Sequence, residues 1–187
     1  MTRGLDFVAD VPYLEPMQTR LVLTVIGTDR PGLVDRLSAA IAGAEGSWQK
    51  SRMARLAGHF AGIVEVAVEP ERKDDLMRAL KALPDLSVEV TETTTTPAPN
   101  PPRIARLAFV GGDRPGLVQA ISRVLARTGA NVDDLETHTF PSPMSGVPLF
   151  EAEAEVHLPD GLGIDELRTE LEAVARDLMV DVQLIEE

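Results

Sequence analysis

The sequence predicts an α+β protein made of two repeated βαββαβ units, and three observations support this. The hexapeptide DRPGLV occurs at residues 29–34 and again at 113–118, an offset of 113 − 29 = 84 residues, which is the length of one small domain. A Thr- and Pro-rich stretch, residues 91–103, lies between the copies and is typical of an extended connector. The same succession of strand and helix patterns occurs on both sides of it.

The first unit begins with an apolar run, RLVLTVIG, that is typical of a buried strand. Leu33, Leu37 and Ile41 then recur at helical spacing. The predicted elements begin with a strand at 20–27 and a helix that stops near Gly43 and Gly46. Two strands follow within 47–68 and turn near 57–59, and the second of them has Phe60, Val64, Val66 and Val68 on one side. A second helix, which ends before Pro84, carries Leu76, Met77, Leu80 and Leu83, and a last strand is predicted at 86–90.

The second unit repeats this order. In its third strand Phe150, Ala152, Ala154, Val156 and Leu158 alternate with acidic residues, as expected for a sheet with one face covered by helices. The predicted strands lie at 103–111, 131–139, 149–158 and 180–185, and a longer ordered surface loop is predicted at 140–148. The first predicted helix carries Leu117, Val118, Ile121, Val124 and Leu125. The second carries Ile164, Leu167, Leu171, Val174 and Leu178.

Each unit therefore has the ferredoxin-like arrangement, with two helices on one face of a four-stranded antiparallel sheet. The expected division is an N-terminal extension at 1–19, a first domain at 20–93, a linker at 94–102 and a second domain at 103–187.

Composition narrows the function classes. The 187 residues include 18 Lys and Arg against 30 Asp and Glu, so the net charge of −12 disfavours direct binding to nucleic acid. The absence of Cys removes thiolate chemistry and fits a reducing compartment. No apolar run is long enough to span a bilayer. We therefore expect a cytoplasmic protein that contacts neither membrane nor nucleic acid.

The repeated hexapeptide has two interpretations. In the structural one it is a strand-to-helix turn, with proline in the first helical turn and Asp29 or Asp113 accepting a hydrogen bond from a free N–H group. In the functional one, Gly32 and Gly116 leave the backbone open, and the helix N-terminus binds a small anion such as the carboxylate of an amino acid. The sequence leaves both open.

Asn131 favours a ligand site at the second copy of the hexapeptide. It opens the strand after the helix, and we expect its amide to lie near the 113–117 turn and to hydrogen-bond a polar ligand. Ser47 occupies the equivalent place in the first unit and is shorter, so the second unit is favoured. The structural interpretation of Asn131 is a residue that satisfies a turn.

The sequence contains no motif typical of metal binding, nucleophilic catalysis or cofactor binding. His59, His138 and His157 are not spaced as metal ligands, and no nucleophile elbow, phosphate loop or dinucleotide motif occurs. We expect no metal, cofactor or catalytic residue. The carboxylates of Glu151, Glu153 and Glu155 fit a solvated strand face or, alternatively, a surface that selects a basic protein partner. Trp48 is expected in the core.

The DRPGLV turn, the βαββαβ pattern and the GANV stretch at 129–132 resemble the ACT domain, a small-molecule-sensing module. The tandem pair, with SRMARLAGHFAGIVEV in one unit and PMSGVPLFEAEAEV in the other, is similar to the glycine cleavage system transcriptional repressor family. The DRPG unit also resembles the N-terminal part of formyltetrahydrofolate deformylases, whose chemistry lies in a further domain.

The resemblance implies a non-enzymatic regulator that binds a small amino acid, glycine first, and acts on a partner protein such as a DNA-binding activator. A homodimer through strand edges is also expected. The alternative is a structural or adaptor module without ligand binding. The ligand-binding residues implied by the resemblance are Asp29, Arg30, Pro31, Gly32 and Leu33 in the first unit, and Gly112, Asp113, Arg114, Pro115, Gly116, Leu117 and Asn131 in the second.

Overall fold

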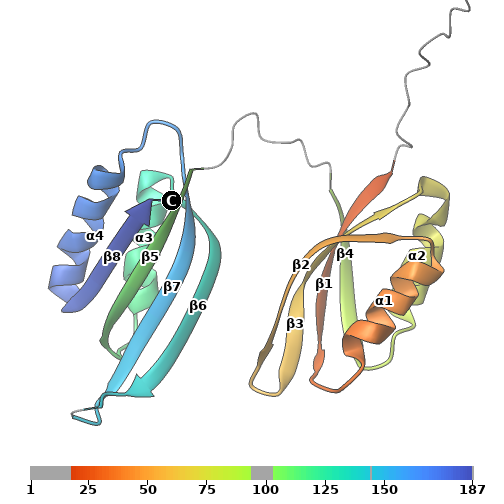
Figure 1. Ribbon diagram of the computed structural model, residues 1–187, viewed down its shortest axis with the longest axis horizontal. Helices are drawn as coiled ribbons and strands as arrows, with labels where there is room; N and C mark the ends of the chain where they lie inside the picture. Colours follow the sequence, from red (N-terminus) through yellow and green to blue (C-terminus); the bar gives the residue numbers. More distant parts are fainter. Residues whose placement is uncertain (1–17, 94–102, 144, 187) are drawn as a thin grey trace, which may run out of the picture. The chain divides into compact units, whose positions relative to one another are not determined.

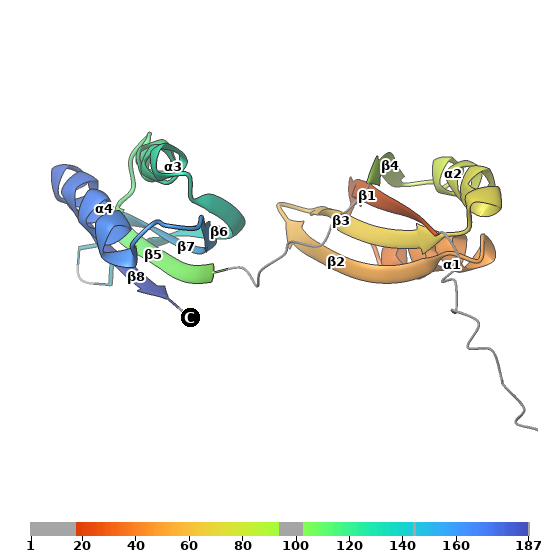
Figure 2. The same cartoon turned by 90° about the horizontal axis from the view of Figure 1, so that it is seen from above.

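A computed structural model of the chain describes residues 18–93, 103–143 and 145–186 (Figure 1). They form two compact units, each a four-stranded antiparallel sheet with both helices on one face (Figures 1 and 2). The predicted α+β class and the repeated βαββαβ order are confirmed. The predicted linker lies outside the described residues, as does the predicted extension except for Gln18 and Thr19, and Thr19 already belongs to the first strand.

The first unit has strand order β2-β3-β1-β4, with β1 in the centre and paired to β3 and β4. Its two helices follow β1 and β3, so both connections return the chain over the same face. The elements are β1 (Thr19–Thr28), α1 (Leu33–Gly43), β2 (Ser47–Leu56), β3 (His59–Val68), the short 3₁₀ helix η1 (Pro70–Arg72), α2 (Lys73–Lys81) and β4 (Leu86–Thr93).

The second unit has the equivalent order β6-β7-β5-β8. In both units a bulge interrupts the edge strand that follows the first helix, at residues 48–50 of β2 and 132–134 of β6. The elements are β5 (Arg103–Gly112), α3 (Leu117–Thr128), β6 (Asn131–Pro141), β7 (Pro148–Leu158), α4 (Ile164–Leu178) and β8 (Val180–Glu186).

Each unit has its own core between sheet and helices. In the first, Leu21, Leu23 and Val25 of β1 are buried against Leu37 of α1 and Leu76 of α2. The second core repeats this with residues of β5, β7, α3 and α4. Every residue predicted to face inward on β7 is buried or packs on the core, and Trp48 is partly buried against the first core as expected.

Three details differ from the sequence predictions. The loop predicted at 140–148 is shorter, because Phe140, Pro141 and Pro148 belong to the β6–β7 hairpin. Helix α2 stops at Lys81, so Leu83 packs on the core from the connection to β4. Pro31 and Pro115 precede their helices, because Gly32 and Gly116 are the N-cap residues.

Two glycines allow the first strand of each unit to lie close to the point where its last strand begins. A Cβ atom on Gly27 would collide with the carbonyl oxygen of Asp85, and one on Gly111 would collide with Val180. These positions are equivalent under the 84-residue offset. Glycine is therefore required at the end of each central strand by close packing.

We expect Gly27→Ala to lower the free energy of unfolding by about 1–3 kcal/mol, because backbone must move to accept the added carbon. Gly43→Ala is the matched control, since no heavy atom lies within 4 Å of its added Cβ. Its stability in urea denaturation should equal that of wild type or exceed it by up to about 1 kcal/mol, because alanine is favoured over glycine within a helix. Equal stabilities of the two variants would contradict the packing argument.

Candidate functional site

The turn between β1 and α1 leaves part of its backbone open. Gly32 has φ +88°, in the left-handed region, and no heavy atom lies within 4 Å of the position a Cβ would take. The first helical hydrogen bond runs from the Arg36 N–H to the Gly32 carbonyl, at 3.0 Å. The N–H groups of residues 33–35 therefore have no partner within the helix and lie at its positive end.

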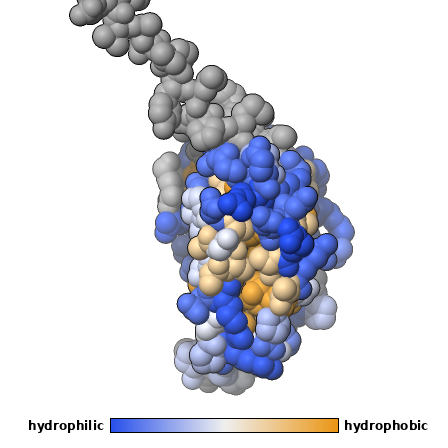
Figure 3. Space-filling view, turned by 90° about the vertical axis from the view of Figure 1, so that its right-hand side faces the viewer, coloured by the Kyte–Doolittle hydropathy of each residue, from blue (hydrophilic) through white to orange (hydrophobic). Residues whose placement is uncertain are grey.

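A hollow of about 310 Å³ lies over this turn. It combines acidic and basic side chains with the open glycine and one aromatic ring. On the helical side of the first unit, apolar side chains gather in a small area framed by hydrophilic ones (Figure 3). The residues lining the hollow are Asp29, Arg30, Gly32, Leu33, Val34, Asp35 and Phe60.

Hairpin contacts hold both turns in place. The N–H of Asp29 donates to the Gly58 carbonyl of the β2–β3 turn at 2.9 Å, and the N–H of Asp113 donates to the Pro148 carbonyl at 2.9 Å. Gly116 repeats the left-handed conformation with φ +94° and is equally open. The backbone of the hexapeptide is thus the same in both units, as its repeated sequence predicts.

The expected capping role of the two aspartates is wrong. Neither α1 nor α3 has a side-chain hydrogen bond at its N-cap. The carboxylate of Asp29 instead lies 2.7 Å from the Arg55 Nε, at the tip of the adjacent hairpin. Glycine at the N-cap position separates each aspartate from the helix, which leaves the helical N–H groups open.

Arg30 ties the first turn to the connection between α2 and β4, and Arg114 ties the second turn to the end of α4. The Nη1 atom of Arg30 lies 3.1 Å from Oδ1 of Asp85, and the Nη1 atom of Arg36 lies 3.5 Å from Oδ2 of the same carboxylate. Arg114 donates to the carbonyl of Leu178, the last residue of α4. A cation at a helix C-terminus is favourable, so Arg114 has a structural role. Arg30 has a similar role but also lines the hollow.

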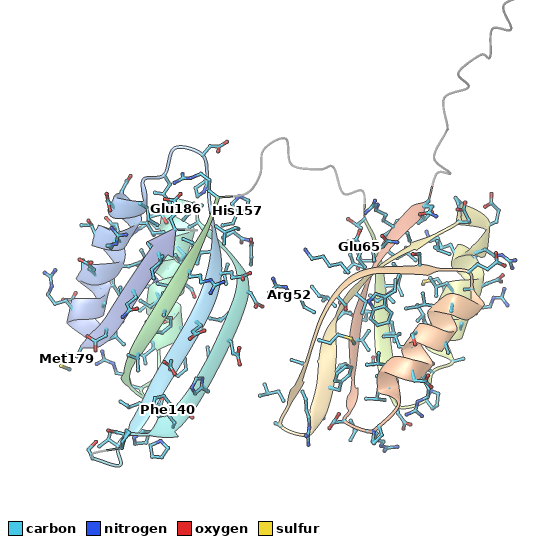
Figure 4. The ribbon with its side chains drawn as sticks, viewed as in Figure 1. Arg52, Glu65, Phe140, His157, Met179 and Glu186 are labelled. Atoms are coloured by element: carbon cyan, nitrogen blue, oxygen red, sulfur yellow. The ribbon has the colours of Figure 1, made fainter. Side chains whose placement is uncertain are left out.

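The predicted proximity of Asn131 to the 113–117 turn is wrong. Asn131 is opposite His157, which pairs with Ile104, whereas the turn follows Gly112. Positions 104 and 112 are eight residues apart on one strand, or about 27 Å. Figure 4 shows His157 and Phe140 at opposite ends of this sheet. Helix α3 carries the chain back before β6 begins, and the Asn131 amide donates to Asp133 at 2.9 Å.

Sequence analysis missed the contributions of Asp35, Phe60 and Arg55 at the first turn. Phe60 and Arg55 reach it because the β2–β3 hairpin turns at Ala57 and Gly58, both with positive φ. A two-residue hairpin predicted there, with the strand order of the fold, could have placed both residues beside the first turn.

Among the described residues, His, Cys, Asp and Glu side chains form no group of three or more that could hold a metal ion. The Nε2 atom of His138 lies 3.0 Å from Oε2 of Glu151, and the Nδ1 atom of His157 lies 4.0 Å from Oδ2 of Asp133. In the described part of the chain no helix combines the length and apolarity that crossing a membrane requires.

Fold and turn together define a tandem ferredoxin-like protein with a small-molecule-sized hollow at a strand–helix turn. The ACT domain family model matches residues 19–95 and 106–184. The chain therefore belongs to the ACT domain family and contains two such domains.

Comparison with known proteins agrees with this. A protein of unknown function from Galdieria sulphuraria is 34% identical, with TM-score 0.81, over 91% of this chain and 99% of its own. A structure named as a candidate glycine cleavage system transcriptional repressor shares the fold, with TM-score 0.71 and 20% identity over 91% and 98% of the two chains.

Two curated relatives match part of the chain. The UPF0237 protein of Methanopyrus kandleri is 35% identical over 79 residues, which are 42% of this chain and 81% of that protein. Formyltetrahydrofolate deformylase of Mycobacterium tuberculosis is 40% identical over 76 residues, or 40% of this chain but only 23% of the enzyme.

We expect Arg114→Ala to destabilise the second unit by about 1–2 kcal/mol, because a partly buried, charge-assisted hydrogen bond is lost. Arg30→Ala should cost less than about 1 kcal/mol, since its ion pair is more exposed. Urea denaturation of both variants measures the difference. A larger loss for Arg30→Ala than for Arg114→Ala would contradict these structural roles.

Proposed function

We propose that this tandem ACT-domain protein is a non-enzymatic regulator that binds a small amino acid at the hollow beside Gly32 and thereby changes its affinity for a partner protein. The observation that carries the proposal is an open left-handed glycine at a helix N-terminus, beneath a hollow lined by charges of both signs. Glycine is the first ligand to test, because the sequence resemblance and one structure of the same fold are both named for glycine cleavage.

The hollow suits a zwitterion. A ligand carboxylate fits the free N–H groups of residues 33–35 and the nearby Arg30, since helix N-termini favour anions. A ligand ammonium group fits the carboxylates of Asp29 and Asp35, which line the same hollow. Arg55 holds Asp29 in place, so this carboxylate is already oriented before a ligand binds.

The first unit is the better candidate on this geometry. The reason for favouring the second unit was the amide of Asn131, and that side chain lies at the far end of its sheet. The second turn, residues 112–117, repeats the open backbone and is the second candidate.

Regulation requires that the ligand bind one state of the protein or its complex better than another. We propose that the partner is itself a protein, such as a DNA-binding activator, because a net charge of −12 opposes direct DNA contact. The aligned part of the Mycobacterium tuberculosis deformylase is 23% of that enzyme, which supports a role outside catalysis.

The experiment is a thermal-shift screen of glycine, serine and the other amino acids on the full chain, followed by calorimetry. A ligand at about 100 times its Kd should add about 2.7 kcal/mol to the stability of the folded state. No hit at millimolar concentrations, with the protein folded, would favour an adaptor without ligand binding.

We expect Gly32→Asn to abolish binding, because the added side chain covers the open backbone while Asn tolerates a positive φ. Asn131→Ala is the matched control, since it removes a polar group far from the turn of its own unit and should leave the affinity unchanged. Calorimetry with the ligand identified in the screen measures both. Unchanged binding in Gly32→Asn and Gly116→Asn would refute the turns as ligand sites.

A further inference from the structure

The face of the first sheet opposite α1 and α2 has an apolar centre. Ile26 of β1 and Ile63 of β3 point away from the helices and are 49% and 51% exposed. They are diagonal neighbours, since Ile63 is opposite Thr24 and Ile26 is opposite Ala61. The outer apolar face consists of these two isoleucines and the smaller Val22, Ala54 and Ala61. Contiguous exposed apolar surface framed by polar residues marks an interaction site.

The fold does not require this apolar centre. At the equivalent positions the second unit has Glu151 in place of Ala61 and Glu153 in place of Ile63. Both sheets have the same strand order and their helices on one face, so a charged outer face is compatible with the architecture. The exposed isoleucines are therefore a property of the first unit's sequence, and covering them is favourable.

The row of residues through Ile63 has opposite charges at its two ends. Arg52 of the edge strand β2 is opposite Ile63, and Glu89 of the other edge strand, β4, is opposite Thr24. Figure 4 shows Arg52 on the side of the sheet away from α1. Strands lie about 4.8 Å apart, so the Cα atoms of Arg52 and Glu89 are about 14 Å apart, with the apolar centre between them. Such a row is complementary to its own two-fold image.

We propose that the outer apolar face binds a second copy of the chain, about a two-fold axis that runs parallel to the strands between β3 and β1. With the strand order β2-β3-β1-β4, this axis places β2 of each copy over β4 of the other. Arg52 of each copy then faces Glu89 of the other. Ile26 of each copy faces Ala61 of the other, so large side chains meet small ones, as they do where two sheets pack face to face.

The face has the size that a specific interface needs. Four strands about 4.8 Å apart and about eight residues long cover about 500 Å² on each copy, at about 3.4 Å per residue. The total of about 1,000 Å² is where specific protein interfaces begin. Arg52 already has an interaction partner in its own chain, so the charges fix the orientation while burial of the isoleucines supplies the affinity.

The outer face of the second unit is a poorer match for the isoleucines. Glu151 and Glu153 stand at its centre, and covering them with apolar side chains would remove them from water. A second copy of the first sheet brings no such cost at its centre. The inference goes beyond the proposed regulatory function and does not depend on amino-acid binding.

The first test is sedimentation velocity of the full chain over a concentration series. We expect wild type to dimerise and Ile63→Glu to raise the Kd of dimerisation about a hundredfold, because it places two carboxylates in the interface. The second unit carries glutamate at the equivalent position, so the sheet accepts this residue. Ile185→Glu is the matched control, since it makes the same change at an exposed isoleucine of the second sheet and should leave the Kd unchanged. The melting temperature of each variant shows that it is folded.

Charge reversal tests the orientation. Arg52→Glu and Glu89→Arg should each raise the Kd of dimerisation about tenfold, because each turns two modest ion pairs into two repulsive ones. The double variant Arg52→Glu/Glu89→Arg should return to within about twofold of wild type. The two positions lie at opposite edges of one sheet, so this rescue requires contact between copies.

Four results would overturn the inference. A wild type that is monomeric at every concentration would show that a second copy does not cover the face. A dimer that persists in Ile63→Glu would assign association to strand edges or another surface. Equal effects of Ile63→Glu and Ile185→Glu would show that added charge alone separates the copies. A double charge reversal without rescue would contradict the two-fold arrangement.

Discussion

Each unit depends on one apolar layer, formed where the inward side chains of the sheet meet the buried stripes of two helices. Because side chains alternate along a strand, Leu21, Leu23 and Val25 enter this layer and the residues between them face away. No polar or charged side chain among the described residues is fully buried. The layer is therefore stabilised by burial of aliphatic groups, and a one-residue slip in register would expose the whole set.

The repeated hexapeptide is largely explained by this architecture. The chain must leave a central strand and start a helix that packs back on the same sheet, and glycine in the left-handed region makes this turn possible twice. Arg30 and Arg114 then join the two turns to different acceptors, the carboxylate of Asp85 directly before β4 and the carbonyl of Leu178 at the end of α4. The fold does not require the open space at Gly32 or the charges around it, and these carry the argument for a ligand.

The fold was predictable because its signals are local and occur twice. Apolar runs, period-two alternation and helical spacing predicted the eight strands and four α-helices of the described residues, but not the short 3₁₀ helix η1. The ends of β6 and β7 shifted because Pro141 and Pro148 join their hairpin. The site was less predictable. Asn131 was misplaced because a helix returns the chain across the full length of the sheet before β6 begins. Phe60 and Arg55 were missed because they reach the turn through hairpin geometry and not through sequence proximity.

The outer faces show what the fold leaves undetermined. A constraint of the sheet would act on both units alike, yet Lys50 and Arg52 of the first unit are replaced by Asp134 and Glu136 at the equivalent places in the second. Placing Glu136 opposite Glu153 raises the free energy of the isolated sheet. The first sheet avoids this cost at the equivalent place, because Arg52 is opposite Ile63 there. The charges on the outer faces are therefore determined by the sequence of each unit and not by the shared fold.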